Sequence, residues 1–427
     1  MKLIKLSEEE FEQFAQNHEQ ATFLQTINWA KLKEKNGWNW ELLGFKKDKK
    51  IICGTMILSK STILGKKMFY APRGFLIDYN NTELLNSFTL ELKKYLKTKK
   101  AIFLKIDPYI MYHQRDIDGK IVPGGIDNSD IVKKLNRLGF NKQCKKPGQQ
   151  SLQATWMYWL PLENKTLDDI LKKMNREKRR IINNNEKNGE VLREGTYDDL
   201  VEFKKIMDHT SERRQFINRS LEYYQNMYKS FGNGKYLKLY FVDLHIEEKL
   251  TSFKEELKKI EADYDKLVLD VKNGTRKVTE NTMNIKKREV TSLKDKIAEY
   301  EVLFKKHGSI LTLGGILYFI YGNEVLAFLG GSYDEFMEFQ SSYTIHYEMI
   351  KYAIENNFKY YNFYGISSDL TPKDHMYGVY LFKKGFGGEV VELIGEYDLK
   401  IDPFFYYIYK FSYFVVHKLK KIKTKIH

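Results

Sequence analysis

Hydrophobic positions in the first third of the chain form short runs typical of strands, with the wider spacing of amphipathic helices between them. Residues 40–45 and 51–58 predict two strands, and residues 101–106 form a buried strand that ends at Asp107-Pro108. Residues 139–153 are polar and contain Pro147-Gly148, which is typical of a boundary. We therefore predict an α/β domain over residues 1–150.

The hydrophobic period changes at residue 246, where apolar side chains begin to recur at alternating spacings of four and three residues. The first series is Ile246, Leu250, Phe253, Leu257, Ile260, Tyr264, Leu267 and Val271. The second is Met283, Val290, Leu293, Ile297, Tyr300 and Phe304, with Lys286 at the position between Met283 and Val290 that would otherwise be apolar. This is the heptad pattern of a coiled coil, and Asn273-Gly274 separates the two series. We predict an antiparallel coiled-coil hairpin over residues 246–307, with arms of about 40 Å at roughly 1.5 Å per residue.

Strand and helix patterns resume after the heptads. Residues 316–321 and 324–329 predict a β-hairpin closed by Gly322-Asn323. Residues 343–356 predict an amphipathic helix, followed by a strand over residues 360–364. The hairpin of heptads thus interrupts a second α/β domain, which we place at residues 151–245 and 308–400.

The last segment, residues 401–427, is rich in aromatic and basic residues and has no acid after position 404. That composition suits a helix lying on an anionic membrane surface. It suits equally a last helix that packs on the body of the protein and ends in a solvated lysine tail. In neither case does it span a bilayer, and no other stretch has the length of a transmembrane helix.

Charge and cysteine content narrow the choice of partners and compartment. The net charge of +15, from 71 Lys and Arg against 56 Asp and Glu, favours anionic partners such as tRNA, nucleotide sugars or lipid surfaces. The excess is spread along the chain, so it fits the lysine-rich composition of an AT-rich genome equally well. Cys53 and Cys144 are the only cysteines, which argues against a disulfide framework. Because the N-terminus also lacks a secretory hydrophobic region, we expect a cytoplasmic protein.

Motifs for common metal, nucleotide and hydrolase chemistry are absent from the sequence. There is no HExxH, no Walker loop, no GxSxG and no metal-ligand spacing, so we expect neither metal nor cofactor. The glycine-rich pyrophosphate loop of an acetyl-CoA-dependent acyltransferase is also missing. What remains are glycine, aromatic and basic clusters at element ends: YAPRG at 70–74, GGS at 330–332 and FKKGFGG at 382–388. Glycine allows the backbone to approach a ligand closely, and lysine offers positive charge.

A longer series of motifs contains these clusters in a characteristic order. It runs FLQT (23–26), WAKLK (29–33), GW (37–38), YAPRGF (70–75), KIDP (105–108), ER (212–213), FINR (216–219) with Tyr223, GGS (330–332), FKKGFG (382–387) and GEY (395–397). Over nearly the whole chain this series resembles the FemABX family of peptidoglycan bridge aminoacyltransferases. A departure is LQAT at 152–155, where the family often has Q-P-R-x-T, so the basic residue of that motif has no counterpart here.

The resemblance implies two acetyltransferase-like (GNAT-like) α/β domains, with a coiled-coil arm inserted in the second as in FemA-type members. It implies transfer of Gly, Ala or Ser from aminoacyl-tRNA to an amine of the peptide stem of a peptidoglycan precursor. The acceptor is lipid II or UDP-MurNAc-pentapeptide, and the basic aromatic tail favours the lipid-linked form. Such an enzyme has to position its substrates and to stabilise the tetrahedral oxyanion.

By their place in the motifs, Lys33, Arg219 and Tyr223 are expected to hold the diphosphate of the precursor, a task suited to charge-assisted hydrogen bonds. Without the resemblance, Lys33 and Arg219 fit a solvated helix face. Lys383 is expected near the transferred carbonyl or the tRNA acceptor end. Asp107, at the end of a strand, fits two roles equally: binding or deprotonating the amine, and capping the turn before Pro108. The other expected substrate-binding residues are Arg73, Gly331, Ser332, Phe382 and Gly385.

Alternatives stay open for the arm and for the whole chain. The arm fits either a brace for tRNA or a self-contained hairpin whose charges only solvate it. The chain as a whole also fits an acetyl-CoA-dependent N-acyltransferase of the same fold, or a non-catalytic scaffold that binds tRNA or the membrane, including peripheral contact at its inner face.

Overall fold

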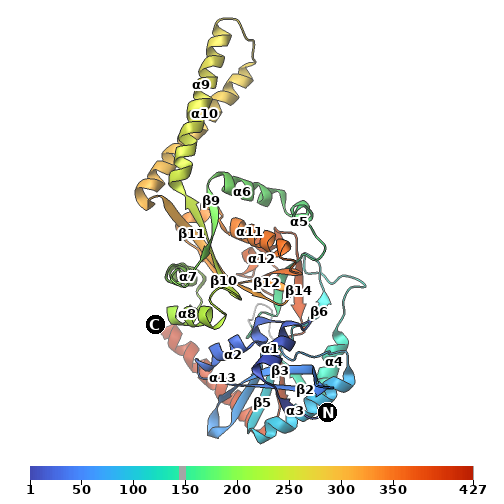
Figure 1. Cartoon of the computed structure of the whole chain (residues 1–427). Coiled ribbons are helices and arrows are strands. Elements are labelled where there is room, and N and C mark those ends of the chain that lie inside the picture. Colours follow the sequence, from blue (N-terminus) through green and yellow to red (C-terminus); the bar gives the residue numbers. More distant parts are fainter. Residues whose placement is uncertain (144–150, 427) are drawn as a thin grey trace.

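The computed structural model describes residues 1–143 and 151–426 and contains two β-sheets with flanking helices, from which a two-helix arm projects (Figure 1). Cys144 and Pro147-Gly148 lie outside these residues. The first sheet has seven strands in the order β1 (Ile4–Lys5), β2 (Asn39–Lys47), β3 (Lys50–Ser61), β4 (Lys67–Ala71), β5 (Ala101–Ile106), β15 (Tyr397–Lys400) and β7 (Phe140–Lys142). The second has eight, in the order β6 (Met111–Gln114), β14 (Glu389–Leu393), β8 (Trp156–Pro161), β13 (Tyr360–Gly365), β12 (Glu324–Ser332), β11 (Ile310–Tyr321), β10 (Leu237–His245) and β9 (Glu190–Gly195). The predicted α/β class is confirmed.

Helices cover both faces of the first sheet. Strand residues alternate between the faces, so Leu43 and Phe45 pack with α3 (Thr82–Thr98) and α4 (Ser129–Arg137), whereas Leu42 packs with α1 (Glu8–Gln16) and α2 (Ile27–Glu34). Asn81 caps α3 by accepting a hydrogen bond from the backbone N–H of Leu84 (3.0 Å). The helices are thus held by their apolar stripes and by local caps.

The second sheet is covered in the same way, and one of its cores continues into the first sheet. Helices α5 (Leu167–Lys173), α6 (Arg176–Lys187), α11 (Ser342–Glu355) and α12 (Tyr377–Lys384) contribute to a core with β8, β11 and β13. Helices α7 (Leu200–Arg214) and α8 (Leu221–Ser230) share the other core with α1 and α2. In that core Phe23 stacks on Phe319 at 3.7 Å between ring centres. The two sheets are therefore joined by continuous apolar packing.

Two strands cross the division at residue 150 that the sequence suggested. β6 precedes that boundary but pairs with β14 of the second sheet, and β15 falls within the second range but pairs with β5 and β7 of the first. Both are short strands of four residues, so neither carries enough periodicity to reveal its partner.

The arm consists of α9 (Ile246–Lys272) and α10 (Glu280–His307), which leave from β10 and return to β11 (Figure 1). These strands are antiparallel neighbours, so the arm lengthens the connection between them. Phe253 packs edge-on against Tyr300 at 5.2 Å, and the Lys254–Glu301 ion pair (2.6 Å) joins the two helices. The hydroxyl of Tyr300 donates to the carbonyl oxygen of Asn188 (2.7 Å), which fixes the base of the arm to the end of α6.

The chain ends in α13 (Pro403–Ile426), which lies across the first sheet. Tyr406 packs against Ile102 and Phe103 of β5, and its hydroxyl donates to Asp398 (2.8 Å). Over the part of the chain that the structure describes, no helix is both long and apolar enough to cross a membrane.

Candidate functional site

Helices α2 and α8 bring Lys33, Arg219 and Tyr223 together, and we call these three residues the cation cluster. Ser220 caps α8 by accepting from the backbone N–H of Tyr223 (3.2 Å), which places Arg219 directly before the first turn. The Lys33 Nζ atom lies 4.3 Å from the ring centre of Trp29 and 6.0 Å from that of Tyr223. The guanidinium carbon of Arg219 lies 5.3 Å from the Tyr223 ring. Positions distant in sequence thus form one group.

The cluster carries positive charge that the protein does not neutralise. Within the residues described, no carboxylate forms an ion pair with Lys33 or Arg219, whereas Lys31 on the same helix pairs with Glu8 at 2.7 Å. Burial, and secondly the charge of Arg219, lower the pKa of Lys33 to about 8. An anion between the two cations would relieve their repulsion, so the cluster is suited to bind one.

A second group of polar residues is buried between the sheets. The Asp107 carboxylate, 1% exposed, accepts from the backbone N–H of Arg73 (2.7 Å) and from the hydroxyl of Tyr70 (3.1 Å). The Arg73 guanidinium lies 3.7 Å from that carboxylate and donates to the carbonyl oxygen of Ala154 (2.6 Å). Burial raises the pKa of Asp107 to about 6, against the opposing effect of Arg73. Asp107 therefore holds the turn that carries Arg73.

Residues that the sequence did not point to extend this buried group. Tyr109 donates to Glu324 (2.8 Å) and its ring lies 5.3 Å from the Arg73 guanidinium carbon. Asn362 donates to Glu324 as well (2.8 Å). Burial raises the pKa of Glu324. Arg73, Tyr109, Glu324 and Tyr364 help to line a small cavity of about 10 Å³, which has room for roughly one water molecule.

Lys383 lies in the last turn of α12 and is 7% exposed. Its Nζ atom donates to the carbonyl oxygens of Gly365 (2.7 Å) and Tyr364 (3.3 Å) at the end of β13. Burial lowers its pKa to about 7. An ammonium group has three N–H donors, so the two carbonyls leave one donor for another acceptor.

A chain of aromatic side chains connects the cation cluster with Lys383. In order from the Lys33 end, the rings are Trp29, Phe23, Phe328 and Tyr364. Neighbouring ring centres along this chain lie 5.5, 5.5 and 5.6 Å apart. The backbone of the last ring's residue, Tyr364, accepts the hydrogen bond from Lys383. The chain passes through the core shared by the two sheets.

The glycine-rich positions nominated for ligand contact have packing roles. A Cβ atom on Gly331 would lie 1.9 Å from Thr210 Oγ1, so glycine lets α7 approach β12. Ser332 pairs with Gly314 in the sheet. A Cβ atom on Gly385 would lie 3.1 Å from the side chain of Lys178.

Phe382, the remaining nominated residue, also lies in the core of the second sheet. Its ring packs on Tyr343 at 4.8 Å and on Phe386 at 5.5 Å. It is one residue from Lys383, so its packing fixes the last turn of α12 and with it the position of the lysine.

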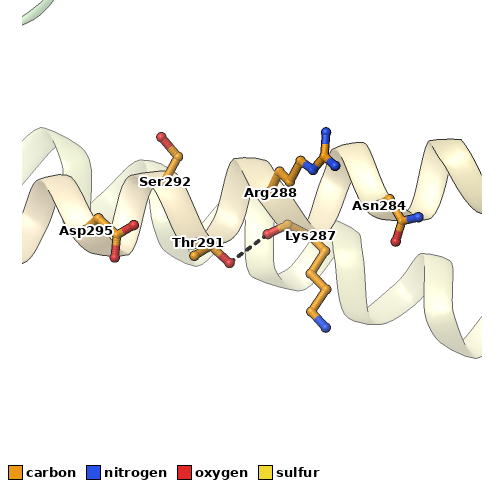
Figure 2. A pocket seen from close by; sticks show the side chains of 6 residues that line it. All are labelled: Asn284, Lys287, Arg288, Thr291, Ser292 and Asp295. Carbon is orange, nitrogen blue, oxygen red and sulfur yellow. Dashed lines mark hydrogen bonds between the residues drawn. The ribbon is translucent and has the colours of Figure 1, made fainter.

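A shallow groove lies away from these groups, on the arm (Figure 2). Its lining is formed by Asn284, Lys287, Arg288, Thr291, Ser292 and Asp295, all on α10. In Figure 2 Arg288 and Lys287 point to opposite sides of the helix, and Thr291 donates to the backbone oxygen of Lys287 (3.1 Å). The side chains do not converge on one point. Across the described residues, no group of three His, Cys, Asp or Glu side chains is arranged to hold a metal ion.

Comparison with known proteins places this geometry in a family. The family model described as "FemAB family" matches residues 6–413. The chain is 31% identical over 429 residues to "Aminoacyltransferase FemA" of Staphylococcus aureus strains bovine RF122 / ET3-1 and N315, covering 100% of both chains in each case. A crystal structure of FemX superposes with a TM-score of 0.81 and 26% identity, over 96% of this chain and 99% of that one. The chain belongs to the FemAB family.

Proposed function

We propose that the protein is an aminoacyltransferase of peptidoglycan bridge synthesis, which transfers Gly, Ala or Ser from aminoacyl-tRNA to a stem-peptide amine of lipid II. Membership of the FemAB family and the aminoacyltransferase name of its FemA relatives support the transferase chemistry. The single observation that supports the choice of acceptor is the cation cluster, whose charges have no carboxylate partner among the described residues.

The diphosphate of the precursor is the anion that the cluster is built to hold. Arg219 offers a planar fork of donors and Lys33 a point charge, and both approach the same tyrosine ring. A bound diphosphate would raise the pKa of Lys33 again, because an opposite charge favours the protonated amine. Binding would therefore be accompanied by proton uptake near pH 8.

The lipid-linked acceptor is supported by the loop that carries Arg219. Phe216 is 42% exposed and Ile217 is 94% exposed, directly before Asn218 and Arg219. Apolar side chains in water beside an anion site suit a diphosphate that continues into a lipid. A soluble nucleotide precursor offers nothing apolar at that point.

In the chemical step, the lone pair of the acceptor amine attacks the ester carbonyl carbon of the charged tRNA. A C–N bond forms, the ester C–O bond breaks, and the ribose oxygen leaves with a proton. We assign the remaining N–H donor of Lys383 to the developing oxyanion. The attacking amine arrives protonated, and its proton is lost to water or to the substrate, because Asp107 is buried beneath the turn at Arg73.

For Asp107 and Arg73 we propose positioning roles. Arg73 lines the small cavity between the sheets, and its buried Nη1 atom has no hydrogen-bond partner among the residues that the structure describes. Asp107 fixes this arginine through its backbone amide. For the arm, pairs such as Lys254–Glu301 and Lys294–Glu261 (both 2.6 Å) occupy lysines within the hairpin, which favours the self-contained alternative over a tRNA brace.

The test is transfer of a radiolabelled amino acid from glycyl-, alanyl- and seryl-tRNA to lipid II and to UDP-MurNAc-pentapeptide. Wild type should label lipid II from one donor, and Lys383→Ala should lose at least tenfold in rate. Lys384→Ala is the matched control, since the neighbouring Lys384 forms a surface ion pair with Asp118. Absence of label with every donor and acceptor would contradict the proposal and favour a non-catalytic scaffold.

A further inference from the structure

Helix α13 leaves a continuous apolar face in water. Phe404, Tyr407, Ile408, Phe411 and Val415 are 69%, 61%, 38%, 70% and 37% exposed. Their spacing of three, one, three and four residues places all of them on one side of an α-helix. Single exposed apolar residues need no explanation, but a contiguous aromatic stripe marks an interaction surface.

The opposite face of the helix fixes the direction in which this stripe points. Tyr406 and Tyr409 pack against Phe103, and the hydroxyl of Tyr406 donates to Asp398. Lys410 forms an ion pair with the same carboxylate (2.9 Å). The helix is therefore anchored to the first sheet along one side, and the aromatic stripe is held outward.

The positive charge of the same helix indicates which kind of partner binds the aromatic stripe. After Lys410, which pairs with Asp398, the sequence contains five more lysines and no acidic residue: Lys418, Lys420, Lys421, Lys423 and Lys425. Lysines close to an anionic bilayer are attracted to its surface. A second copy of the chain would bring the same positive charge to the contact, which disfavours self-association through this face.

We propose that the exposed aromatic stripe of α13 docks the protein on the surface of an anionic lipid bilayer. The helix lies in the plane of the interface, with the stripe at the boundary between headgroups and acyl chains. Two kinds of attraction, apolar and electrostatic, act together, as stable peripheral binding requires. This docking does not depend on the proposed transfer activity, so it can be measured without tRNA or precursor.

The experiment is co-sedimentation of the full chain with vesicles of phosphatidylglycerol or phosphatidylcholine. Wild type should bind phosphatidylglycerol vesicles at least tenfold more tightly than phosphatidylcholine vesicles, and 0.5 M salt should weaken that binding. The variant Phe404→Gln/Phe411→Gln should lose at least tenfold in affinity. The matched control is Leu90→Gln/Val302→Gln, at two other exposed apolar positions (55% and 66%), and it should bind like wild type.

Three results would overturn the proposal. They are failure of wild type to bind phosphatidylglycerol vesicles, equal binding by Phe404→Gln/Phe411→Gln, and equal loss in the control. Light scattering of the free protein provides a further check, because a dimer that the stripe variant converts to a monomer would identify a second copy as the partner. Circular dichroism spectra of both variants should match wild type, which separates lost docking from misfolding.

Discussion

At the scale of single residues, burial shifts the pKa values of several ionisable side chains toward neutral pH. Burial is the largest cause in each case: it lowers the pKa of Lys33 to about 8 and that of Lys383 to about 7, and it raises the pKa of Asp107 to about 6. Of the three, Lys33 is partly exposed, whereas Lys383 is 7% exposed and Asp107 is enclosed by Arg73 and Tyr70. We therefore assign anion binding to the cation cluster and oxyanion stabilisation to the remaining N–H donor of Lys383.

Acceptor binding should weaken as the pH rises through about 8. The pKa of Lys33 lies below its ordinary value of 10.5, so the free protein loses this charge between about pH 7 and pH 9. Arginine stays protonated throughout this range, so Lys33→Arg should show a flatter profile. The measurement is the KM for lipid II from pH 6.5 to 9.5. Identical profiles for wild type and Lys33→Arg would rule out Lys33 as the titrating group.

Asp107 should prove to be a structural support for Arg73. Asp107→Ala removes the acceptor of the Arg73 backbone amide and the carboxylate that lies 3.7 Å from the buried Arg73 guanidinium, so it should lower the free energy of unfolding by about 3–5 kcal/mol. Asp107→Asn keeps one oxygen for the Arg73 amide and should retain most of kcat, whereas a general base would lose nearly all of it. Urea unfolding and steady-state kinetics on both variants separate the two roles. An inactive but fully stable Asp107→Asn would contradict this assignment.

Sequence motifs can point to single residues, whereas contacts between residues that are distant in the sequence depend on the fold. The motif series predicts site roles for Lys33, Arg219, Tyr223, Lys383 and Asp107. It missed the Tyr109–Glu324 bond, because those residues are 215 positions apart and the fold alone unites them.

At the scale of elements, hydrophobic periodicity predicted the long helices best. The heptads over residues 246–307 coincide with α9 and α10. A period that is sustained over many residues is a strong signal for a helix. Short strands such as β6 and β15 carry no such signal, and their partners are chosen by tertiary packing. The glycine-rich motifs predict ligand contacts at Gly331 and Gly385, and this stays a prediction. The structure adds that both glycines have close packing neighbours, which the sequence does not reveal.

Gly331→Ala should therefore act on stability. The added methyl group would meet Thr210 at 1.9 Å, and relieving that overlap should cost about 1–3 kcal/mol of unfolding free energy. Thr210→Ala in the same chain should recover part of the loss. Gly378→Ala, in a helix with nothing within 4 Å, is the control and should be neutral or stabilising. Equal urea unfolding of Gly331→Ala and wild type would contradict a stabilising role for the close contact between α7 and β12.

At the scale of the whole molecule, the two sheets behave as one body because they share a core and exchange strands. Residues of α1, α2 and β3 pack with α7, α8 and β11 in a single apolar cluster. β6 and β15 each pair across the sequence division. The cation cluster, formed by α2 from one part and α8 from the other, depends on this joining.

The body should unfold in one calorimetric transition. Phe88→Ala removes a fully buried side chain from the core of the first sheet, at a cost of about 3–5 kcal/mol. The shared core transmits that loss, so the whole transition should move to lower temperature without splitting. Two separated peaks in Phe88→Ala would show that the sheets are independent.

The central claim is that Lys33 and Arg219 hold the diphosphate of the acceptor. The most direct measurement is the rate of amino-acid transfer against lipid II concentration for wild type, Lys33→Ala/Arg219→Ala and the control Lys31→Ala. The account predicts that the double variant raises the KM for lipid II at least tenfold with the KM for aminoacyl-tRNA unchanged, while Lys31→Ala behaves like wild type. An unchanged KM for lipid II in the double variant would contradict it.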